Sequence, residues 1–485
     1  MTYPAIDEVK EIAKTGEYRM CPVARDLLSD FTTPVETMRR LLGTSSHCFM
    51  LESADASKQW GRYSFLGYDP VLTVSCLDDV MKVGERTFET DDPASVIRDL
   101  ISKRRAPRIS GMPSFTGGFV GYFAYDYLKY SEPSLKLDAE NTEGFMDVDL
   151  MLFDKVIVFD NYAQKLIIIA NMSLEGDVEA NYAAALKSID AVENVIRNGK
   201  PKVLKGRMLS EFKPLFDEET FCGMVEKAKE HIREGDIFQV VPSNRLEADF
   251  EGSLFDTYRV LRTLNPSPYM FYLSGDMEVA GASPETLVKL EDGVVHTFPL
   301  AGTRPRGKTV EEDLELERDL LADPKELAEH NMLVDLGRND IGKISKFGTV
   351  RVERYHEIVR FSHVMHIGST VGGVIRDDLD AIDAIDSILP AGTLSGAPKI
   401  RACQIINDLE NNKRGIYGGA IGYIDLAGNM DTAIGIRTAY KKNGKVFVRS
   451  GAGIVADSVP EKEHQECLNK ARALLVALKQ AEGLQ

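Results

Sequence analysis

The clearest structural signal in the chain lies in the segment Asp323-Pro-Lys-Glu-Leu-Ala-Glu-His-Asn-Met-Leu-Val-Asp-Leu336. Asp323 can accept the unpaired backbone N–H groups of a helix start, and Pro324 suits the first helical position, where a backbone N–H has no partner. Glu326 and Glu329 are three residues apart, so they share a helix face that continues into apolar positions. The segment predicts a helix from Pro324 to Leu336 that presents two carboxylates beside the core.

A second pair of carboxylates occurs near the C-terminus. Ser458-Val-Pro-Glu461 has the spacing of a capping box, and Glu463 and Glu466 again lie three residues apart on one helix face. Four carboxylates on two helices offer the oxygen ligands that a hard cation such as Mg²⁺ prefers. Glutamate pairs at this spacing are also common on solvated helices, so the residues alone leave both interpretations open.

The surrounding sequence alternates helical and β-like segments. Short apolar runs such as Val156–Asp160 and Lys165–Ala170, on either side of a polar turn, predict strands and a hairpin. Strands with helices between and after them favour an α+β fold over a regular βαβ winding. Apolar periodicity predicts helices over 179–197, 218–233, 324–336 and 461–481, and further strands are expected over 271–274, 420–424 and 445–450.

A linker-like segment divides the chain. Residues 198–215 contain two glycines, two prolines and several lysines, a composition typical of a connection between domains. We therefore expect an N-terminal domain over 1–200 and a C-terminal domain over 218–476. The length of 485 residues accommodates two such units.

Composition excludes several classes of protein. Asp and Glu outnumber Lys and Arg by 75 to 58, and the formal net charge of −17 would repel nucleic acid and acidic membrane surfaces. The N-terminus lacks a cationic segment followed by an apolar one, and no window of about 18 apolar residues occurs. The 6 cysteines are scattered without paired spacing. We expect a cytoplasmic protein with reduced thiols that binds neither nucleic acid nor membrane.

Three glycine-rich loops accompany the acid pairs in the second half of the chain. Gly302–Gly307, Pro390–Lys399 and Gly451–Ile454 place glycines beside hydroxyls, cations or free backbone N–H groups. Such loops let the backbone approach a small anion closely, although simple turn formation is the alternative explanation. None has the spacing of a nucleotide-binding loop, so the expected ligand is a small polyanion rather than a nucleotide.

Together these segments strongly resemble component I of anthranilate synthases, the large subunit within the chorismate-utilising family. The resemblance covers residues 218–476 almost continuously, and Leu51–Ser53 and Trp60–Gly67 share it, so nearly the whole chain is included. It implies the chorismate-utilising enzyme fold, with antiparallel sheets, flanking helices and two interlocked subdomains. The motifs that carry it are Gly281-Ala-Ser-Pro-Glu285, Pro299-Leu-Ala-Gly-Thr-Arg-Pro-Arg-Gly307, Glu329-His-Asn-Met-Leu-Val-Asp-Leu-Gly-Arg-Asn-Asp340, Arg360-Phe-Ser-His-Val-Met-His366, residues 389–399 and Gly451-Ala-Gly-Ile-Val-Ala-Asp-Ser458.

The resemblance implies a lyase that converts chorismate and ammonia to anthranilate and pyruvate, the first committed step of tryptophan biosynthesis. Ammonia adds to the ring, the 4-hydroxyl leaves, and the enolpyruvyl side chain is then eliminated. By the same resemblance Mg²⁺ joins Glu329 and Glu466 to the ring carboxylate of chorismate, while Glu326 and Glu463 hold metal-bound water. A cation between these acids removes the repulsion between an acidic protein and a dianionic substrate.

Further site residues follow from the same motifs. Glu285 corresponds to the acid that protonates the departing hydroxyl, a role that requires a raised pKa. His366 corresponds to a histidine that is important for pyruvate elimination, with a purely structural histidine as the alternative, and Thr393 fits a hydroxyl donor. Arg437 offers a planar fork to a carboxylate. The expected chorismate contacts are Gly302, Thr303, Tyr417, Arg437, Gly451, Ala452 and Gly453.

Two positions separate this chain from relatives that make other products. Gln239 stands where isochorismate and salicylate synthases carry a lysine that activates water, and a glutamine cannot be that base. Ala301 stands where aminodeoxychorismate synthases typically carry a lysine that can form a covalent adduct with the ring. Both positions favour direct attack by ammonia. The alternatives are aminodeoxychorismate synthase component I and a non-catalytic tryptophan-binding regulator of the same fold.

The resemblance also implies a partner and an inhibitor. The surroundings of Cys222 do not fit a glutaminase nucleophile, so a separate glutamine amidotransferase subunit, component II, is expected to supply ammonia within a hetero-oligomer. Tryptophan is expected to act as feedback inhibitor at a site between the two domains. Packing around a Pro-rich turn is the alternative explanation of the same residues. The site would comprise Ser53, Pro268, Tyr269 and Met270.

Overall fold

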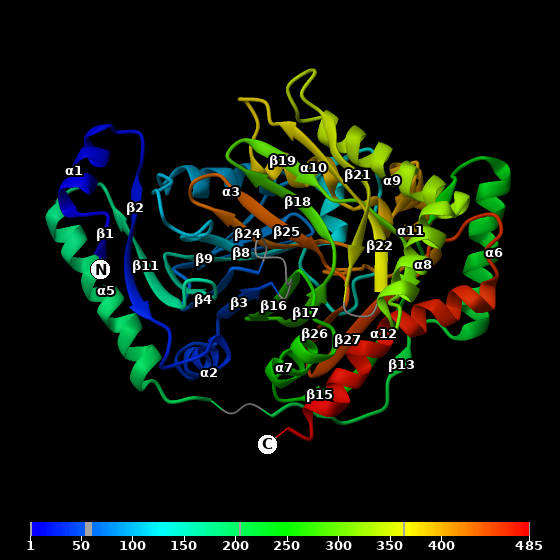
Figure 1. Cartoon of the computed structure of the whole chain (residues 1–485), viewed down its shortest axis with the longest axis horizontal. Helices are drawn as coiled ribbons and strands as arrows, with labels where there is room; N and C mark the ends of the chain where they lie inside the picture. The colour runs from blue at the N-terminus through cyan, green and yellow to red at the C-terminus, as the bar shows by residue number, and fades with distance from the viewer. Residues whose placement is uncertain (1, 54–60, 203–204, 362–363, 485) are drawn as a thin grey trace.

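The computed structural model describes residues 2–53, 61–202, 205–361 and 364–484. Trp60, Ser362 and His363, which belong to motifs quoted above, lie outside the described residues. Two large antiparallel sheets occupy the middle of the molecule, and helices lie around them (Figure 1). The expected α+β class is confirmed.

The first sheet has 13 strands among the described residues and combines both halves of the chain. The predicted hairpin forms its β10–β11 pair, with Lys155 opposite Ala170. In spatial order the strands are β1 (Thr2–Tyr3), β2 (Met20–Leu28), β11 (Lys165–Ser173), β10 (Lys155–Asp160), β4 (Tyr63–Tyr68), β3 (Cys48–Glu52), β16 (Tyr269–Ser274), β17 (Glu278–Ser283), β26 (Thr438–Lys442), β27 (Lys445–Gly451), β15 (Ser243–Glu251) and β12 (Arg207–Met208), with β13 (Lys213–Pro214) also paired to β15.

The second sheet has 12 described strands and is likewise shared. Its order is β20 (Leu300–Pro305), β22 (Val364–Val374), β19 (Val294–Thr297), β18 (Thr286–Glu291), β25 (Met430–Ile434), β24 (Ala420–Asp425), β8 (Gly118–Phe123), β9 (Val148–Phe153), β5 (Leu72–Leu77), β6 (Val80–Val83) and β7 (Arg86–Glu89), with β21 (Arg351–Arg360) paired to β22. Two short strands, β14 (Gln239–Val240) and β23 (Gly396–Ala397), pair separately. Because both sheets draw strands from both halves, the halves interlock.

The helices pack on the outer sides of the sheets. The expected helix near residue 324 continues beyond Leu336 to Gly342. The helices are α1 (Ile6–Lys14), α2 (Pro34–Thr44), α3 (Pro93–Ser102), α4 (Leu128–Ser131), α5 (Val178–Asn198), α6 (Glu218–Glu234), α7 (Phe255–Leu264), α8 (Val310–Ala322), α9 (Pro324–Gly342), α10 (Ala381–Ile388), α11 (Lys399–Glu410) and α12 (Pro460–Ala481), with 3-10 turns η1 (Tyr125–Tyr127) and η2 (Gly392–Leu394). In the part of the chain described, no helix combines the length and apolarity needed to cross a bilayer.

The core has three main layers. One apolar cluster lies between the first sheet and α2, α5, α7 and α12, and another lies between the second sheet and α3, α9 and α10. A third cluster joins the two sheets: Phe49 and Phe271 of the first sheet share it with Phe153 of the second, and each of these side chains is at most 2% exposed. Burial of one such side chain contributes about 1.5–3 kcal/mol, so the sheets are held face to face mainly by this inter-sheet core.

Two glycines of β8, Gly118 and Gly121, allow close contact between strands. A Cβ atom on Gly118 would lie 2.2 Å from the Ile424 carbonyl oxygen, and one on Gly121 would lie 2.0 Å from that of Asp149. Both glycines have φ above +140°, which L side chains rarely adopt. The strands on either side of β8 can therefore approach only because these residues have no side chain.

Candidate active site

The backbone of Glu285 is fixed between β17 and β18, where its carbonyl accepts the Ile434 N–H at 3.0 Å. The Thr393 hydroxyl, on η2, donates to Glu285 Oε1 at 3.0 Å. Burial raises the pKa of the Glu285 carboxyl to about 7, against the opposing effects of the Thr393 hydroxyl and the charge of Lys470. Glu285 can therefore carry a proton near neutral pH. A cavity of about 40 Å³ lies between these two side chains and the apolar side of α9.

His366 lies on β22 beside Gly302, which belongs to strand β20 and not to the loop that the sequence predicted there. Its Nδ1 atom is 2.8 Å from the Gly302 carbonyl oxygen and 3.1 Å from Thr303 Oγ1. Because a carbonyl oxygen can only accept, Nδ1 carries the proton and Nε2 keeps its lone pair. Burial lowers the pKa of the imidazole, and the charge of Arg437 adds to this while the Gly302 bond opposes it. The ring is thus a neutral imidazole that can accept a proton at Nε2.

The first acid pair lies in the first two turns of α9. Asp323 caps this helix as predicted, since its Oδ1 accepts the N–H groups of Lys325 at 3.0 Å and Glu326 at 3.3 Å. Glu326 faces Gly302, where a Cβ atom would lie 3.1 Å from Glu326 Oε2. Burial raises the pKa of Glu326, and the negative charge of Glu329 raises it further. The two carboxylates are therefore neighbours that repel each other.

The second acid pair lies at the start of α12, but the predicted capping box is wrong. The helix begins at Pro460 with Val459 at the N-cap, so Ser458 lies one residue too early to cap it. The Ser458 hydroxyl instead accepts a backbone N–H of the preceding loop at 3.1 Å. Burial raises the pKa of Glu463 and the charge of Glu466 adds to this, while a hydrogen bond to Ser458 opposes it.

The two helix starts lie on the same side of the molecule (Figure 1), and the charge of Lys325 on α9 acts on Glu463 on α12. Within each pair, one carboxylate raises the pKa of the other. Arg304 is the nearest ion-pair partner of Glu326, at 3.6 Å from Oε1. Carboxylate oxygens are the ligands that a hard divalent cation such as Mg²⁺ prefers, and such a cation would relieve this repulsion, although among the described residues no three of these acids have ligand atoms within 4.8 Å of one another. The four carboxylates are those of Glu326, Glu329, Glu463 and Glu466.

Arg437 lies in the turn between β25 and β26, with φ of 52°. Its carbonyl accepts the Ala282 N–H at 3.1 Å, which fixes the turn. The guanidinium is half-buried and forms no ion pair with any residue in the described ranges. Burial lowers the pKa of Arg437, with an opposing effect from Tyr417. An unpaired guanidinium out of water favours an anionic ligand, because a carboxylate would restore the lost interactions.

The glycine-rich loop after β27 lies beside Tyr417. A Cβ atom on Gly451 would lie 2.9 Å from Tyr417 Oη and 2.7 Å from the Pro242 carbonyl oxygen, so only a glycine fits there. The next residue, Ala452, is fully buried and donates its N–H to the same carbonyl at 3.2 Å. The loop therefore presents its backbone, without side chains, next to the Tyr417 hydroxyl.

Lys470 is a site residue that the sequence reasoning missed. It lies one helical turn after Glu466, with Nζ 2.7 Å from Glu466 Oε1, and it donates to the Gly451 carbonyl oxygen at 3.0 Å. Its charge also acts on Glu285. The only sequence signal was the i, i+4 spacing from Glu466, and such pairs are common on exposed helices. The contact with Gly451 exists only in the folded chain.

Strand β14 connects two of the glycine-rich loops. Val240 pairs with Gly396 on one side and bridges to Ile454 on the other. Gln239, which is 6% exposed, lies beside the second loop, since a Cβ atom on Gly453 would be 2.7 Å from Gln239 Nε2. Its Oε1 atom is buried and accepts no hydrogen bond from the residues that the structure describes.

The four predicted regulatory residues come together at the paired ends of β3 and β16. Met270 lies opposite Glu52, which places the next residue, Ser53, beside Tyr269, and Pro268 precedes them. The Tyr269 hydroxyl is 2.8 Å from Thr286 Oγ1, and Thr286 directly follows Glu285 in the chain. This group is therefore separate from the acid pairs but connected to the strand that positions Glu285.

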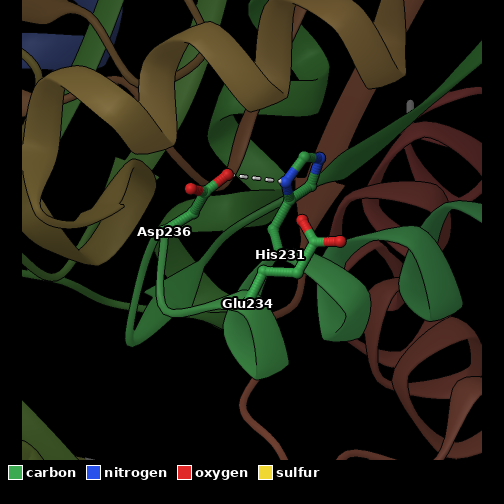
Figure 2. A group of neighbouring side chains, drawn as sticks. All are labelled: His231, Glu234 and Asp236. Carbon is green, nitrogen blue, oxygen red and sulfur yellow. Dashed lines mark hydrogen bonds and ion pairs between the residues drawn. The ribbon is translucent and has the colours of Figure 1, made fainter.

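A second group of metal-ligand types, which includes none of the predicted acids, lies at the end of α6 (Figure 2). His231 Nδ1 is 2.9 Å from Asp236 Oδ2, and Glu234 points toward the same space. Arg401 donates to the same Asp236 oxygen at 2.6 Å. The hydrogen bonds from Arg401 and His231 lower the pKa of Asp236. The positive charge of Arg401 makes this group a local ion-pair cluster.

A family model described as chorismate binding enzyme matches residues 46–476, which is most of the chain. The chain belongs to the chorismate-binding enzyme family. The matched range contains each of the four acids at the helix starts, together with Glu285, His366 and Arg437. The resemblance on which the sequence predictions rest is therefore confirmed at the level of the family.

Similar members of the chorismate-binding enzyme family include anthranilate synthase component 1 of Acetivibrio thermocellus, 46% identical over 99% of both chains. The corresponding protein of Aquifex aeolicus is 45% identical over 99% of both chains. A crystal structure of anthranilate synthase component I from Streptococcus pneumoniae is 41% identical, with a TM-score of 0.78 over 85% of this chain and 92% of that one.

The fold extends to more distant proteins. The menaquinone-specific isochorismate synthase of Escherichia coli is 20% identical and superposes with a TM-score of 0.70, over 98% of this chain and 99% of that one. At this identity the likeness shows the fold alone. The arrangement of two interlocked antiparallel sheets is thus common to proteins with different named products.

Proposed function

We propose that this protein is the chorismate-binding component of an anthranilate synthase, which converts chorismate and ammonia to anthranilate, pyruvate and water. The observation that carries the proposal is the convergence of groups at Gly451. Lys470 donates to its carbonyl, and the Tyr417 hydroxyl lies 2.9 Å from where a Cβ atom of Gly451 would be. The charge of Lys470 acts on Glu285, and Tyr417 interacts with Arg437. A proton donor and two cations thus surround one loop of bare backbone.

The residues suit a dicarboxylate that loses a hydroxyl. Arg437 and Lys470 are the cations that hold carboxylates of chorismate, Arg437 through its planar fork. With a pKa of about 7, Glu285 is partly protonated at neutral pH, and its protonated form donates a proton to the 4-hydroxyl as that group leaves as water. The neutral His366 then accepts at Nε2 the ring proton that is lost as pyruvate departs. Thr393 keeps the Glu285 carboxyl oriented through its hydrogen bond to Oε1.

Mg²⁺ is the cofactor that the acid pairs favour. Glu329 and Glu466 would hold the ion itself, and Glu326 and Glu463 would hold its water ligands. When bound, Mg²⁺ supplies positive charge to the ring carboxylate and so permits a protein of net charge −17 to bind a dianion. The mutual repulsion within each acid pair supports this assignment.

Two uncharged residues, Ala301 and Gln239, favour ammonia as the nucleophile. Ala301 is buried on β20 and cannot form an adduct with the ring, which argues against an aminodeoxychorismate synthase. Gln239 offers a buried acceptor atom but no base. This suits ammonia, which attacks without first losing a proton, better than water, which needs a base. A separate glutamine amidotransferase subunit would supply ammonia from glutamine in a hetero-oligomer.

Tryptophan is the inhibitor that we assign to Ser53, Pro268, Tyr269 and Met270. The hydrogen bond from Tyr269 to Thr286 supports a route from this group to Glu285. Binding that shifts Tyr269 would move the strand on which the acid depends, because Thr286 and Glu285 are adjacent residues.

The test is an assay of the purified chain with chorismate, Mg²⁺ and ammonium salt, in which anthranilate is identified by fluorescence and mass. We expect product that EDTA abolishes and tryptophan suppresses, and no product when glutamine replaces ammonium. A product with the mass of aminodeoxychorismate would refute the assigned reaction. Turnover with glutamine alone would refute the separate amidotransferase, and turnover insensitive to tryptophan would refute the inhibitor site.

A further inference from the structure

A cavity of about 210 Å³ lies between the two sheets, at the end of β16 opposite Tyr269. We call it the inter-sheet pocket. One wall comes from β5, β6, β8 and β9 of the second sheet, and the other from the end of β16 and the turn into β17 of the first. None of the residues assigned above to catalysis, substrate, metal or inhibitor lines it. It is lined by His47, Thr73, Ser75, Lys82, Gly121, Tyr122, Asp149, Met151, Leu273, Gly275, Asp276, Met277 and Val279.

Several polar side chains of the inter-sheet pocket form no hydrogen bond or ion pair within the part of the chain that the structure describes. Within the described residues, the side chains of Thr73, Ser75, Lys82, Asp149 and Asp276 have no hydrogen-bond or ion-pair partner in the protein. Polar groups that are withdrawn from bulk water normally find a partner in the protein, in ordered water or in a ligand. Asp149 is half-buried, as are Thr73 and Ser75, whereas Lys82 and Asp276 are exposed, so Asp149 is the most buried charged group of the five. The pocket therefore offers several donors and acceptors without internal partners.

Two acids of the inter-sheet pocket share the charge of one lysine. Burial raises the pKa of Asp149 to about 7, the charge of Asp276 adds to this, and Lys442 opposes it. The Lys442 ammonium acts on both acids and also donates to the Gly144 carbonyl, so one positive charge faces two carboxyl groups. A positive charge placed between Asp149 and Asp276 would be attracted by both carboxylates.

The remaining walls of the inter-sheet pocket are apolar. Met151, Leu273, Met277 and Val279 belong to the inter-sheet core, and each of them is at most 6% exposed. Methionine side chains adapt their shape to a ligand at low energetic cost. A bare cation would leave this surface unused, and a pocket of this volume has room for a small organic molecule.

We propose that the inter-sheet pocket binds a small organic ammonium ion, with its charge between Asp149 and Asp276 and its hydrocarbon part against Leu273 and Met277. A small anion is disfavoured because the deepest charged group is a carboxylate. A bare metal ion is disfavoured because it would leave the apolar wall of the pocket without contacts. The site is distinct from the acid pairs and from the group around Tyr269.

The test uses benzylammonium as the probe and isothermal titration calorimetry of the whole chain at pH 8. We expect saturable binding with a millimolar or lower dissociation constant, at least about 10-fold tighter than that of the neutral benzyl alcohol. Asp149→Asn should weaken benzylammonium binding by about 10-fold and leave that of benzyl alcohol little changed. The matched control is Glu230→Gln, an exposed position on α6 that undergoes the same loss of charge.

Asp276→Asn provides a second variant, because Asp276 is exposed and its replacement does not disturb the core. It should weaken binding of the probe in the same direction. The proposal is overturned if the chain gives no saturable heat with benzylammonium, if benzyl alcohol binds equally well, or if Glu230→Gln weakens binding as much as the pocket variants do.

Discussion

Glu285 illustrates how burial sets chemistry at a single residue. A glutamate in water has a pKa near 4.5 and is ionised at neutral pH, so it has no proton to give. Between β17 and η2 the pKa of the carboxyl rises to about 7, mainly through loss of water. The same loss of water lowers the pKa of Arg437 and that of His366, which keeps the imidazole of His366 neutral. Three residue types thus acquire acid, anion-binding and base properties from their surroundings.

Glu285→Gln should remove the proton donor while it preserves shape and the Thr393 hydrogen bond. We expect kcat for anthranilate formation to fall by about 10²–10⁴-fold, the range of a general acid. In the wild type, kcat should fall as pH rises through about 7, because the proton is lost there. Steady-state rates between pH 6 and 9 check this. A variant that keeps wild-type kcat and pH profile would contradict the role of Glu285.

The same residue makes a prediction about stability. The folded-state pKa of Glu285 is raised above its unfolded value, so the folded protein is favoured at low pH and loses stability as pH rises from about 4.5 to 7. Glu285→Gln has no proton to lose and should be more stable than wild type by on the order of 1–3 kcal/mol at pH 8, with little difference at pH 5. Urea unfolding at both pH values measures the difference.

At the scale of elements, the acid-bearing start of α9 is positioned by β20. Gly302 has φ of +68°, and its missing side chain leaves space for Glu326. The other end of the helix is fixed by a buried ion pair, in which Lys399 Nζ lies 2.6 Å from Asp340 Oδ2 and also donates to the Ile388 carbonyl at 2.7 Å. The helix therefore has little freedom to adjust to a group inserted at its start.

Gly302→Ala should displace Glu326 and weaken the use of Mg²⁺. We expect the Mg²⁺ concentration for half-maximal activity to rise by about 10-fold, because the new methyl group would lie 3.1 Å from Glu326 Oε2 and a positive φ costs about 1–2 kcal/mol. Gly348→Ala is the control, since Gly348 has φ of +76° with open space around it. An equal effect of the two substitutions would show that backbone strain, and not contact with Glu326, is responsible.

Tyr269→Phe tests the connection between the β3–β16 ends and Glu285. Its hydroxyl donates to Asp431 Oδ1 at 2.8 Å and lies 2.8 Å from Thr286 Oγ1. Loss of a hydrogen bond to a charged group costs about 1.5–3 kcal/mol, which corresponds to at least about a 10-fold change in an equilibrium constant. If this bond links tryptophan binding to Glu285, half-inhibition should require at least about 10-fold more tryptophan. Inhibition curves of ammonia-dependent activity measure this, with Tyr182→Phe, a hydroxyl bonded to Pro4 elsewhere, as control. An unchanged inhibition curve would show that the Tyr269 hydroxyl has no role in inhibition by tryptophan.

At the scale of the whole molecule, a buried ionic cluster joins the loops of the site. Glu410, Arg414 and Arg449 are each at most 3% exposed. Arg414 donates to the carbonyls of Leu394 at 2.7 Å and Val241 at 2.6 Å, which belong to the segments that carry Thr393 and Gln239. Glu410 accepts from Arg449 at 2.7 Å, next to the Gly451 loop. The cluster therefore holds three separate loops in place through its hydrogen bonds and ion pairs.

Arg414→Met should destabilise the protein by about 3–5 kcal/mol, because it leaves two carbonyls unsatisfied and removes one of the partners of Glu410. Because the loops carry both substrate-binding and acid-orienting groups, kcat/KM should fall as well. Denaturant unfolding and kinetics measure the two effects. Arg338→Met, which removes an exposed ion pair with Asp335, should cost less than about 1 kcal/mol. Comparable losses in the two variants would contradict this role of the cluster.

Local signals in the sequence were sufficient for several elements. The cap at Asp323 and the hairpin from Lys155 to Ser173 depend on residues close in the chain, so their patterns predicted them correctly. The cap at Ser458 failed because Pro460 takes the first helical position and moves the start by one residue. Lys470 was missed because its partner at Gly451 is distant in sequence.

The sequence by itself determined the family, the class of fold and the residue types available for chemistry, since these follow from motifs and local periodicity. The tertiary structure alone decided which of those residues meet. It brought Glu326 against Gly302, Lys470 onto Gly451 and Asp149 beside Asp276. The physical reason is that pKa values, ion pairs and cavities depend on distances between residues far apart in the chain, and only packing of the two shared sheets fixes those distances.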